Sequence, residues 1–182
     1  IEGWVPRDIA AASGADQDTG VLEIGPGIGP LTVQLARRAG KVVAVELDRT
    51  LLPILEETLS GFPNAEVVPG DVLKLDLPAL VADKFSGLTP IVCANLPYNI
   101  TTPVLTALLE CGRFHSITVM IQREVAGRIC AAPGTADYGA FSLFCQYHAR
   151  TELLFDVPPE CFLPSSEERR VGQACRSWWA LH

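Results

Sequence analysis

Residues 19–40, which read TGVLEIGPGIGPLTVQLARRAG, decide the fold class, because an apolar run gives way to a glycine-rich turn and then to helical spacing. The β-branched and aliphatic residues at its start predict a buried strand. Gly25, Gly27 and Gly29 predict a turn whose backbone can approach a ligand closely. From Pro30 onward the apolar residues recur at helical spacing. A strand, a turn and a helix in this order are typical of a parallel sheet covered by helices.

The same alternation continues along the chain. Further strands are expected at residues 41–48, 65–71, 89–98 and 116–122, and further helices at 49–61, 102–112 and 123–131. The last two apolar segments, 141–149 and 151–158, have no helix between them and predict a hairpin. We therefore expect an α/β fold, a mostly parallel doubly wound sheet with an antiparallel edge hairpin and with Leu22 and Ile24 in its core. In such sheets ligands bind at the carboxyl ends of the strands.

The composition limits the class of protein. With 182 residues, of which 48% are hydrophobic, the chain can bury a core the size of one domain. No apolar run approaches the roughly 20 residues of a membrane span, and the start lacks a basic segment followed by an apolar one, so we expect a cytoplasmic protein that contacts no membrane. The net charge of -7 excludes a uniformly basic surface for nucleic acid. A local RNA contact by Arg113, Arg123 and Arg128 stays open, although a solvated helix face explains these arginines better.

The six cysteines are spread along the chain without the spacing of a zinc site. Most lie in apolar stretches such as IVCAN and LFCQY. We expect small buried side chains in a reducing compartment, with neither a disulfide framework nor a bound metal.

Distinct features mark the carboxyl ends of the first three predicted strands. The glycine turn has the spacing G-x-G-x-G and so departs from the G-x-G-x-x-G fingerprint of dinucleotide binding. Glu46 ends the second strand, where an acidic side chain can accept hydrogen bonds from both hydroxyls of a ribose; a surface carboxylate is the alternative. Asp71 ends the third strand and can accept a hydrogen bond from the amino group of an adenine. Asp76, nearby, is expected to cap a helix.

The fourth predicted strand ends in NLPYNI, residues 95–100. Asn95 brings an amide, Pro97 stiffens the backbone and Tyr98 adds an aromatic ring. In isolation this segment is typical of a turn that ends a strand. Beside the glycine turn and the two acidic strand ends, it instead completes a pocket for a ribose and an adenine, next to an amide and an aromatic side chain.

This order of parts resembles the Rossmann-like, class I methyltransferases that use S-adenosylmethionine. Seven segments in succession look like the family of ribosomal RNA adenine dimethyltransferases, and the resemblance covers roughly residues 1–164. These segments are VLEIGPGIGPLTVQLA, VVAVELD, GDVLKLD, NLPYNITTPVL, MIQREVAGRI, APGTADYGAFSLFCQY and DVPPECFLP.

The resemblance implies roles for the residues at the strand ends. Gly25 would lie beside the methionine part of S-adenosylmethionine, and Gly27 and Gly29 would shape the same loop. Glu46 would hold the ribose of this cofactor and Asp71 its adenine. Asn95 would lie close to the sulfonium and to the target base. The resemblance implies no metal.

The resemblance also implies how the target adenine is presented. The side-chain oxygen of Asn95 and the backbone carbonyl of Leu96, held by the rigid Pro97, would accept the two hydrogens of the exocyclic amine. Tyr98 would stack on the extracted base. Phe162 resembles the aromatic residue on the other side of that base, although a core aromatic is equally consistent with its position.

The function implied by the resemblance is methyl transfer to adenines of small-subunit ribosomal RNA, giving dimethyladenosine during ribosome biogenesis, by a monomer. Enzymes that modify large-subunit RNA and confer antibiotic resistance are a close alternative, and they usually have isoleucine where Leu96 stands. Non-catalytic assembly or transcription factors that bind RNA on the same fold are another alternative. A nicotinamide dehydrogenase is disfavoured by the glycine spacing.

Both ends of the chain depart from the family pattern. Residues 1–164 are expected to form the methyltransferase domain without the N-terminal segment that closes over the cofactor. Residues 165–182, SSEERRVGQACRSWWALH, are expected to be a tail that is not native family sequence, standing in place of the family's C-terminal helical domain. We expect this tail to be dispensable for the folded core, and the chain to have weak or no activity.

Overall fold

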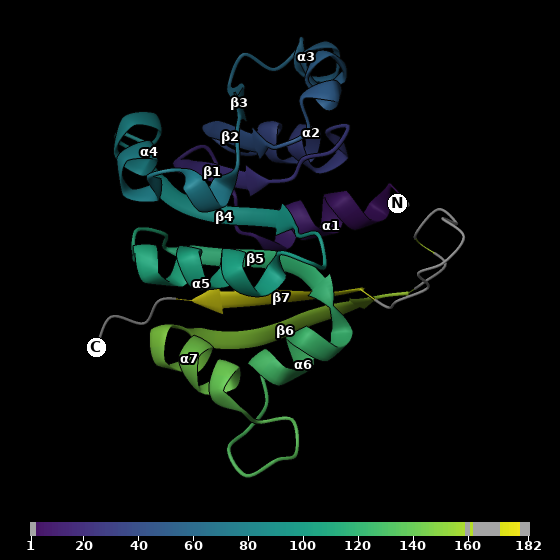
Figure 1. The fold of residues 1–182 in the computed structure, drawn as a ribbon. Helices are drawn as coiled ribbons and strands as arrows, with labels where there is room; N and C mark the ends of the chain where they lie inside the picture. Colours follow the sequence, from purple (N-terminus) through teal and green to yellow (C-terminus); the bar gives the residue numbers. More distant parts are fainter. Residues whose placement is uncertain (1–2, 159–160, 162–171, 179–182) are drawn as a thin grey trace.

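The structure is a computed structural model that describes residues 3–158, 161 and 172–178 (Figure 1). The strands are β1 (Thr19–Ile24), β2 (Lys41–Glu46), β3 (Ala65–Pro69), β4 (Thr89–Asn95), β5 (Ser116–Gln122), β6 (Arg150–Val157) and β7 (Gly172–Trp178). The α-helices are α1 (Trp4–Ala12), α2 (Pro30–Ala36), α3 (Leu52–Leu59), α4 (Leu77–Lys84), α5 (Thr101–Cys111), α6 (Arg123–Ile129) and α7 (Ala140–His148). Short 3-10 turns, Arg49–Leu51 and Val72–Lys74, follow β2 and β3. None of the helices formed by the described residues has the length and apolar character needed to cross a membrane.

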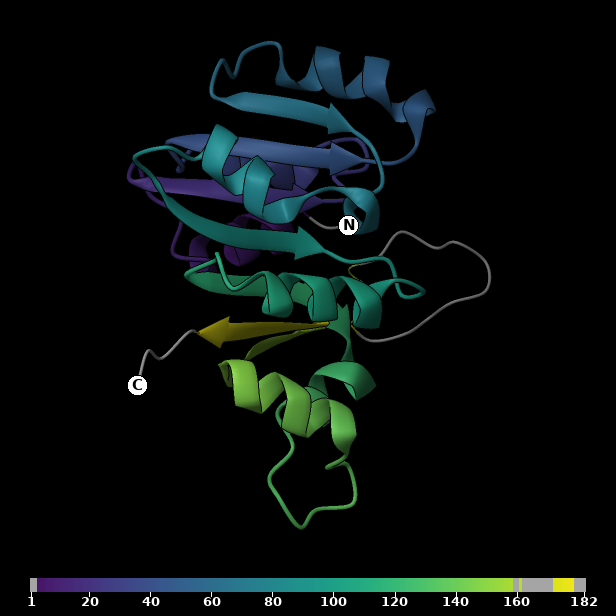
Figure 2. The same cartoon turned by 60° about the vertical axis from the view of Figure 1, so that its left-hand side comes forward.

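The strands form one sheet in the order β3-β2-β1-β4-β5-β7-β6. Strands β1 to β5 are parallel, whereas β7 is antiparallel to both of its neighbours. In Figure 2 the blue and teal strands β2 to β4 point to the same edge of the sheet, and the yellow strand β7 points the opposite way. The strand order reverses between β1 and β4, which is the position where doubly wound sheets bind ligands. A dinucleotide-binding sheet of order 3-2-1-4-5-6 has no inserted antiparallel strand, so the topology also differs from that class.

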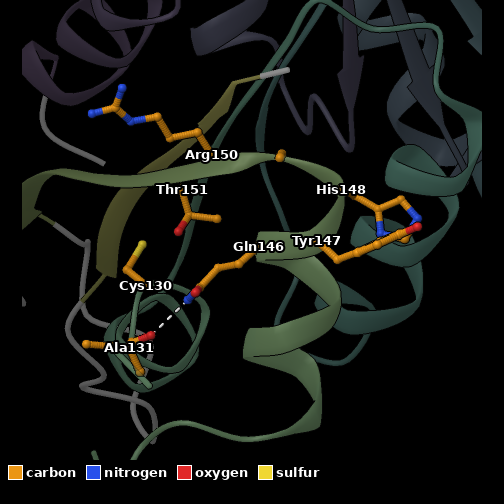
Figure 3. A pocket seen from close by; sticks show the side chains of 9 residues that line it. Cys130, Ala131, Gln146, Tyr147, His148, Arg150 and Thr151 are labelled. Atoms are coloured by element: carbon orange, nitrogen blue, oxygen red, sulfur yellow. Dashed lines mark hydrogen bonds between the residues drawn. The ribbon is translucent and has the colours of Figure 1, made fainter. Parts of the chain in front are cut away.

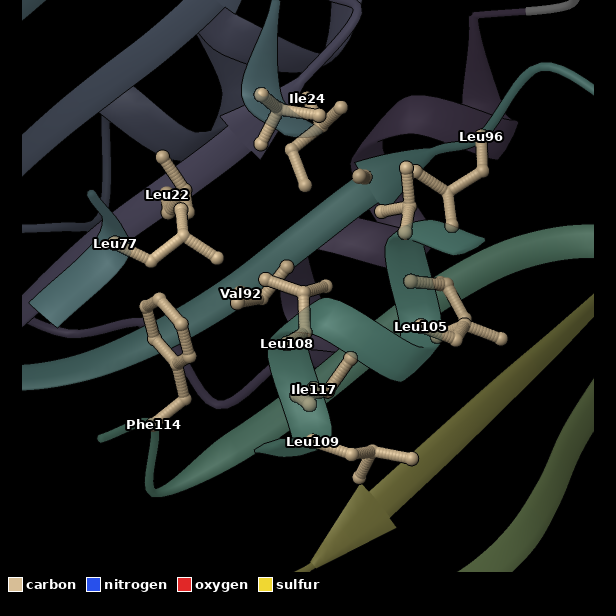
Figure 4. Close-up of a cluster of buried hydrophobic side chains, with 14 of the residues drawn as sticks. Leu22, Ile24, Leu77, Val92, Leu96, Leu105, Leu108, Leu109, Phe114 and Ile117 are labelled. Atoms are coloured by element: carbon tan, nitrogen blue, oxygen red, sulfur yellow. The ribbon is translucent and has the colours of Figure 1, made fainter. Parts of the chain in front are cut away.

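The two faces of the sheet bury different side chains, because successive residues of a strand point to opposite sides. Leu22 and Ile24 of β1 lie in the larger core, beneath α4 and α5 (Figure 4), which confirms their predicted place. Val21 lies in the second core, beneath α1 and α2. Glu23 stands between Leu22 and Ile24 in the strand, so it shares the face of Val21 and points toward α1 and α2.

The predicted parallel strands and the helices between them are confirmed, with ends shifted by a few residues. The prediction of a hairpin between residues 141–149 and 151–158 is wrong for the first of these segments, because residues 140–148 form helix α7. Phe141, Phe144 and Cys145 recur at helical spacing, and the two phenylalanine rings stack with centroids 6.3 Å apart. The Oγ of Ser142 accepts a hydrogen bond from the backbone N–H just before the helix at 3.0 Å. The aromatic residues of this segment suggested a strand. In the structure they pack along one face of a helix instead.

The prediction of an antiparallel pair of strands at the edge of the sheet is confirmed. The pair consists of β6 and β7 instead of the two segments 141–149 and 151–158. Strand β7 pairs with β5 from Gly172↔Gln122 to Trp178↔Ser116, and it pairs with β6 over the same residues. The predicted boundary after residue 164 therefore does not separate the sheet from the tail, since part of the tail lies between two strands. The non-native origin of residues 165–182 stays a prediction.

Three of the cysteines, Cys93, Cys145 and Cys161, are buried, as expected of small apolar side chains. Burial raises the pKa of the Cys145 thiol to about 12, and burial also raises the pKa of Cys93. The thiols of Cys93 and Cys145 are therefore protonated at neutral pH.

Candidate active site

The glycine turn after β1 adopts a backbone that other residues rarely reach. Gly25, Gly27 and Gly29 have φ angles of 67°, 61° and 91°, so a side chain at any of them would be strained. The N–H of Gly25 donates to the carbonyl oxygen of Val45 at 3.0 Å, which ties the end of β1 to the end of β2. A Cβ on Gly25 would lie 3.7 Å from Pro97, so the turn also lies against the segment after β4.

Glu46, the last residue of β2, joins the glycine turn to the turn after its own strand. Its Oε2 accepts a hydrogen bond from the N–H of Gly27 at 3.2 Å, and its Oε1 accepts one from the N–H of Asp48 at 2.8 Å. The side chain is buried, with 6% of its surface exposed. An ionised carboxylate has about four acceptor positions. Each oxygen of Glu46 therefore keeps acceptor capacity for a ligand hydroxyl.

A backbone hydrogen bond holds the segment that carries Asp71 beside Glu46. The N–H of Gly70, which precedes Asp71, donates to the carbonyl oxygen of Glu46 at 2.8 Å. The Oδ1 of Asp71 accepts a hydrogen bond from the N–H of Leu73 at 3.0 Å, and its Oδ2 lies 3.7 Å from the Nζ of Lys74. Asp71 thus caps the 3-10 turn after β3. The predicted cap Asp76 is confirmed as well, since its Oδ1 accepts from the N–H of Ala79 at 3.0 Å.

The hexapeptide 95–100 leaves the sheet as a rigid turn. The N–H of Leu96 donates to the carbonyl oxygen of Met120 at 3.1 Å, and the Leu96 side chain is buried in the larger core with 2% of its surface exposed. Only the backbone of Leu96 can therefore face a ligand. The carbonyl oxygen of Pro97 accepts from the Oγ1 of Thr101 at 3.1 Å, which fixes the turn to the start of α5. Tyr98 is 39% exposed.

The structure thus brings together the predicted residues that it describes. Glu23, Gly25 and Asn95 line one small cavity of about 40 Å³ between the carboxyl ends of β1 and β4 and helix α1. Glu46 reaches the glycine turn through Gly27, and Asp71 lies just after the end of the neighbouring strand β3. Phe162 lies outside the described residues, so its predicted contact with a base stays a prediction.

Four large apolar side chains are exposed in the loops that follow β1 to β4. They are Ile28, Leu47, Leu73 and Tyr98. An apolar rim of this kind suits the faces of a planar base. Of these four residues, only Tyr98 was predicted from the sequence to contact a ligand. The other three could have been found from their position, because each is an apolar residue within a few positions of a strand end.

Glu23 is a candidate that sequence reasoning missed. It lies inside the apolar run of β1, and its side chain is 1% exposed. Its Oε2 has no hydrogen-bond partner. Burial raises the pKa of Glu23 to about 8, and the nearby charge of Glu46 adds to the effect while the Thr32 hydroxyl opposes it. A carboxyl group in an otherwise apolar strand was the signal in the sequence, because an acidic side chain is seldom fully buried without a partner.

A larger cavity, of about 580 Å³, lies elsewhere in the molecule (Figure 3). Its lining includes Gln146, Tyr147, Arg150 and Thr151. Arg150 begins β6 and is level with Ser116 at the start of β5, so this cavity lies at the amino edge of the sheet. None of the predicted site residues lines it, and the candidate site is the smaller cavity with the strand ends around it. Among the described residues, no group of three or more His, Cys, Asp or Glu side chains could hold a metal ion.

Known proteins resemble this chain over most of its length. The sequence model of a family described as ribosomal RNA adenine dimethylase matches residues 5–170. The ribosomal RNA small subunit methyltransferase A of Shouchella clausii is 53% identical over 158 residues, which are 86% of this chain and 53% of that protein. The chain therefore spans about half the length of the curated relatives it matches.

Two solved structures share the fold. A dimethyladenosine transferase from Plasmodium falciparum superposes with a TM-score of 0.83 at 24% identity, over 97% of this chain and 62% of that one. The 23S rRNA methyltransferase ErmE superposes with the same TM-score of 0.83 at 28% identity, over 97% of this chain and 68% of that one. The strand ends that carry the candidate site thus belong to a sheet also found in RNA methyltransferases.

Proposed function

Because this chain belongs to the ribosomal RNA adenine dimethylase family, we propose that it transfers methyl groups from S-adenosylmethionine to the exocyclic amine of adenines in small-subunit ribosomal RNA. The product is dimethyladenosine, and the reaction belongs to ribosome biogenesis. The protein acts as a monomer in the cytoplasm, with ribosomal RNA as its partner.

One observation carries the proposal: the glycine turn, Glu46 and Asn95 meet at the carboxyl edge of the sheet, where β1 and β4 diverge. Glu46 Oε2 is bonded to the N–H of Gly27 at 3.2 Å, and Gly25 shares a cavity with Asn95. An acidic side chain with acceptor capacity suits a ribose, and a backbone without Cβ atoms suits the close approach of a ligand. These features fit an adenosyl cofactor.

Three of the predicted residues would contact the cofactor directly. Glu46 accepts from the ribose hydroxyls, and its bonds to the N–H groups of Gly27 and Asp48 keep the carboxylate in place. Asp71 accepts from the amino group of the adenine. Gly25 leaves room for the methionine part. When bound, S-adenosylmethionine supplies an activated methyl group, so the protein has to orient the partner of that group.

The hexapeptide would present the target amine. The lone pair of an adenine amine is delocalised into the ring, which makes the nitrogen a poor nucleophile. The side-chain oxygen of Asn95 and the carbonyl oxygen of Leu96 accept its two hydrogens and favour a lone pair directed at the methyl group. The buried Leu96 side chain and the Pro97 turn hold these acceptors in place. No side chain is needed as a general base, because the methylated amine loses its proton to water.

Methylation of large-subunit RNA is the second candidate, supported by the shared fold with ErmE. The identity of 53% to a small-subunit enzyme, against 28% to ErmE, favours the small subunit. A non-catalytic RNA-binding role is the third candidate, and the meeting of Gly25, Glu46 and Asn95 favours catalysis over it.

The proposal is tested by methyl transfer from isotopically labelled S-adenosylmethionine to small ribosomal subunits that lack adenine methylation. Large subunits serve as the second substrate, and the full-length relative from Shouchella clausii serves as the positive control. Label in dimethyladenosine of the small subunit supports the proposal. Label in the large subunit alone would assign the chain to the second candidate, and the absence of both cofactor binding and methyl transfer would assign it to the third.

Replacing Glu46 by alanine is expected to weaken S-adenosylmethionine binding at least about tenfold, because hydrogen bonds to a charged acceptor contribute about 1.5–3 kcal/mol. The same change leaves the N–H groups of Gly27 and Asp48 without their acceptor, so the thermal midpoint should fall too. Calorimetric titration and thermal unfolding measure the two effects. Glu56→Ala, on the exposed face of α3, is the control and should change neither. Unchanged affinity in Glu46→Ala would exclude a ribose contact.

Replacing Tyr98 by alanine is expected to lower the efficiency of methyl transfer about 5- to 150-fold, which corresponds to a stacking contribution of about 1–3 kcal/mol. Tyr98→Phe keeps the ring and should retain most activity. Tyr147→Ala is the matched control, because that side chain is 83% exposed at the amino edge of the sheet. The loss should appear with RNA as substrate, while cofactor affinity stays constant. Equal activity of Tyr98→Ala and the wild type would remove Tyr98 from the RNA site.

A further inference from the structure

Gln122 ends β5, and the proposed function leaves its side chain unused. The residue is half-buried and stands just before α6. Its side chain makes no hydrogen bond that caps this helix, and within the described part of the chain its amide has no other hydrogen-bond partner. The amide of Gln146, by contrast, donates to two carbonyl oxygens, at 2.9 and 2.8 Å. The amide of Gln122 therefore keeps a donor and an acceptor for a ligand.

The side chain of Gln122 lies on the same face of the sheet as that of Asn95. Along β5, Met120 lies in the second core and Ile121 in the larger core, so Gln122 returns to the face covered by α1. Asn95 and Met120 line the small cavity together with residues of α1, so Asn95 belongs to this face too. The two side-chain amides thus share one face at the carboxyl edge of the sheet.

The two amides also stand on neighbouring strands. Strands β4 and β5 are parallel and adjacent, and Asn95 is level with Met120. Gln122 therefore stands two residues nearer the carboxyl edge than Asn95, about 7 Å along the strand direction. A base that enters from solvent with its amine at Asn95 has the rest of its ring at the level of Gln122. Gly25 has no side chain, so Gln122 supplies a side-chain donor on the β5 side of Asn95.

We propose that Gln122 recognises the ring of the target adenine, its Nε2 donating a hydrogen bond to a ring nitrogen that flanks the exocyclic amine. This inference rests on the proposed function, in which Asn95 and Leu96 accept the two hydrogens of that amine. Both flanking nitrogens of adenine, N1 and N7, are acceptors, and glutamine is a common partner of the adenine edge. Guanine has a carbonyl oxygen in place of this amine and an N–H at N1, so it mismatches these groups.

The hydrogen bond from Gln122 restrains the base in a direction that the other contacts leave open. Asn95 and Leu96 hold the base at its amine, and stacking on Tyr98 holds the plane of the ring. The base can still swing within that plane about the amine. A contact at a flanking ring nitrogen stops this motion and keeps the nitrogen lone pair directed at the methyl group. Gln122 thus binds and orients the base, and it transfers no proton.

Single-turnover methyl transfer to small ribosomal subunits tests the inference, with the adenines that the wild type methylates replaced by 1-deazaadenine or by 7-deazaadenine. Each analogue keeps the amine and lacks one flanking nitrogen. On unmodified subunits, Gln122→Ala should be about 2- to 13-fold less efficient than the wild type, as expected for one neutral hydrogen bond. This difference should disappear on the analogue that lacks the contacted nitrogen. Comparing the two proteins on the same substrate cancels the intrinsic reactivity of each analogue.

Two further variants sharpen the test. Gln34→Ala is the matched control, because Gln34 is a half-buried glutamine on α2 that does not line the small cavity, and it should behave as the wild type on every substrate. Gln122→Glu keeps the shape of the side chain but places an acceptor opposite the ring nitrogen, so it should lose more activity than Gln122→Ala. Gln122→Ala should keep the cofactor affinity and the thermal midpoint of the wild type, because the side chain caps no helix.

Each other outcome counts against the inference in a distinct way. Equal efficiency of Gln122→Ala and the wild type on unmodified subunits would overturn it and leave the proposed function intact; this is the result expected if the amide only contacts water. A difference that persists on both analogues would overturn it too, because the loss would then come from a change in the surrounding structure. A loss of cofactor affinity would place Gln122 at the cofactor instead of the base. No transfer by the wild type to any subunit would overturn the proposed function and this inference together.

Discussion

Replacing Asn95 by alanine is expected to reduce methyl transfer to small-subunit ribosomal RNA at least about 100-fold, the order of loss seen when one preorganised hydrogen-bonding group is removed from a reacting centre. Asn95 is the last residue of β4, half-buried and paired with Met120 of β5, so its amide is held by the sheet. In the proposed mechanism it accepts one hydrogen of the target amine. Alanine leaves the Leu96 carbonyl as the only acceptor and loses the orientation of the nitrogen lone pair.

The measurement is single-turnover incorporation of labelled methyl groups, with cofactor affinity determined in parallel. Asn99→Ala is the matched control, because it removes the same amide from an exposed position of the same hexapeptide and should retain activity. Thermal unfolding should be similar for both variants. Full activity in Asn95→Ala would show that the hexapeptide has another role. A loss that saturating cofactor restores would make Asn95 a cofactor ligand instead of the group that orients the amine.

Much of the fold could be predicted from local patterns in the sequence. Buried parallel strands are continuous apolar runs, and each of the five is followed by a glycine, an acidic residue or an amide that ends it. The pattern was less informative at residues 140–148, where Phe141 and Phe144 suit a strand and a helix equally over so short a segment. Which neighbour each strand takes is a nonlocal property. The insertion of β7 between β5 and β6 therefore could not be predicted from spacing.

The candidate site was predictable where the chemistry requires a particular residue type. Gly25 and Gly27 stand where φ is positive, and an acidic residue at the end of β2 stands where both of its oxygens can be used. Glu23 was missed because a strand pattern treats each position as apolar or polar, while the cost of burying a carboxyl group depends on partners that only the three-dimensional structure provides.

The glycine turn and Glu23 together explain why one strand, β1, carries so much of the site. Its last residues alternate between the two faces of the sheet, so Ile24 stabilises the larger core while Glu23 enters the cavity under α1. The strand then ends in Gly25, which is bonded to β2 and lies against Pro97. A substitution at Gly25 would thus strain the backbone and shift both neighbouring strand ends at once.

Removing residues 165–182 is expected to lower the thermal midpoint by about 10 °C or more, and to broaden or abolish cooperative unfolding. Strand β7 pairs along its length with β5 on one side and with β6 on the other. Its loss leaves the facing N–H and C=O groups of both strands without partners, each costing about 1–3 kcal/mol where water cannot reach it. At about 2–4 °C per kcal/mol for a chain of this size, a few such groups already give the expected shift.

A lower midpoint would support a structural role for β7, whereas the sequence alone led us to expect that the tail is dispensable. Cys175→Pro tests the same pairing without shortening the chain, because Cys175 is level with Val119 on β5 and with Leu153 on β6, and proline removes a backbone donor in the middle of a strand. Cys175→Ala keeps the backbone and is the matched control. If β7 holds β5 and β6 together, the shortened chain and Cys175→Pro should both unfold at lower temperature, while Cys175→Ala stays close to the wild type. Midpoints that agree with the wild type in the first two variants would mean that β1 to β6 fold without β7, and that the tail adds nothing to the sheet.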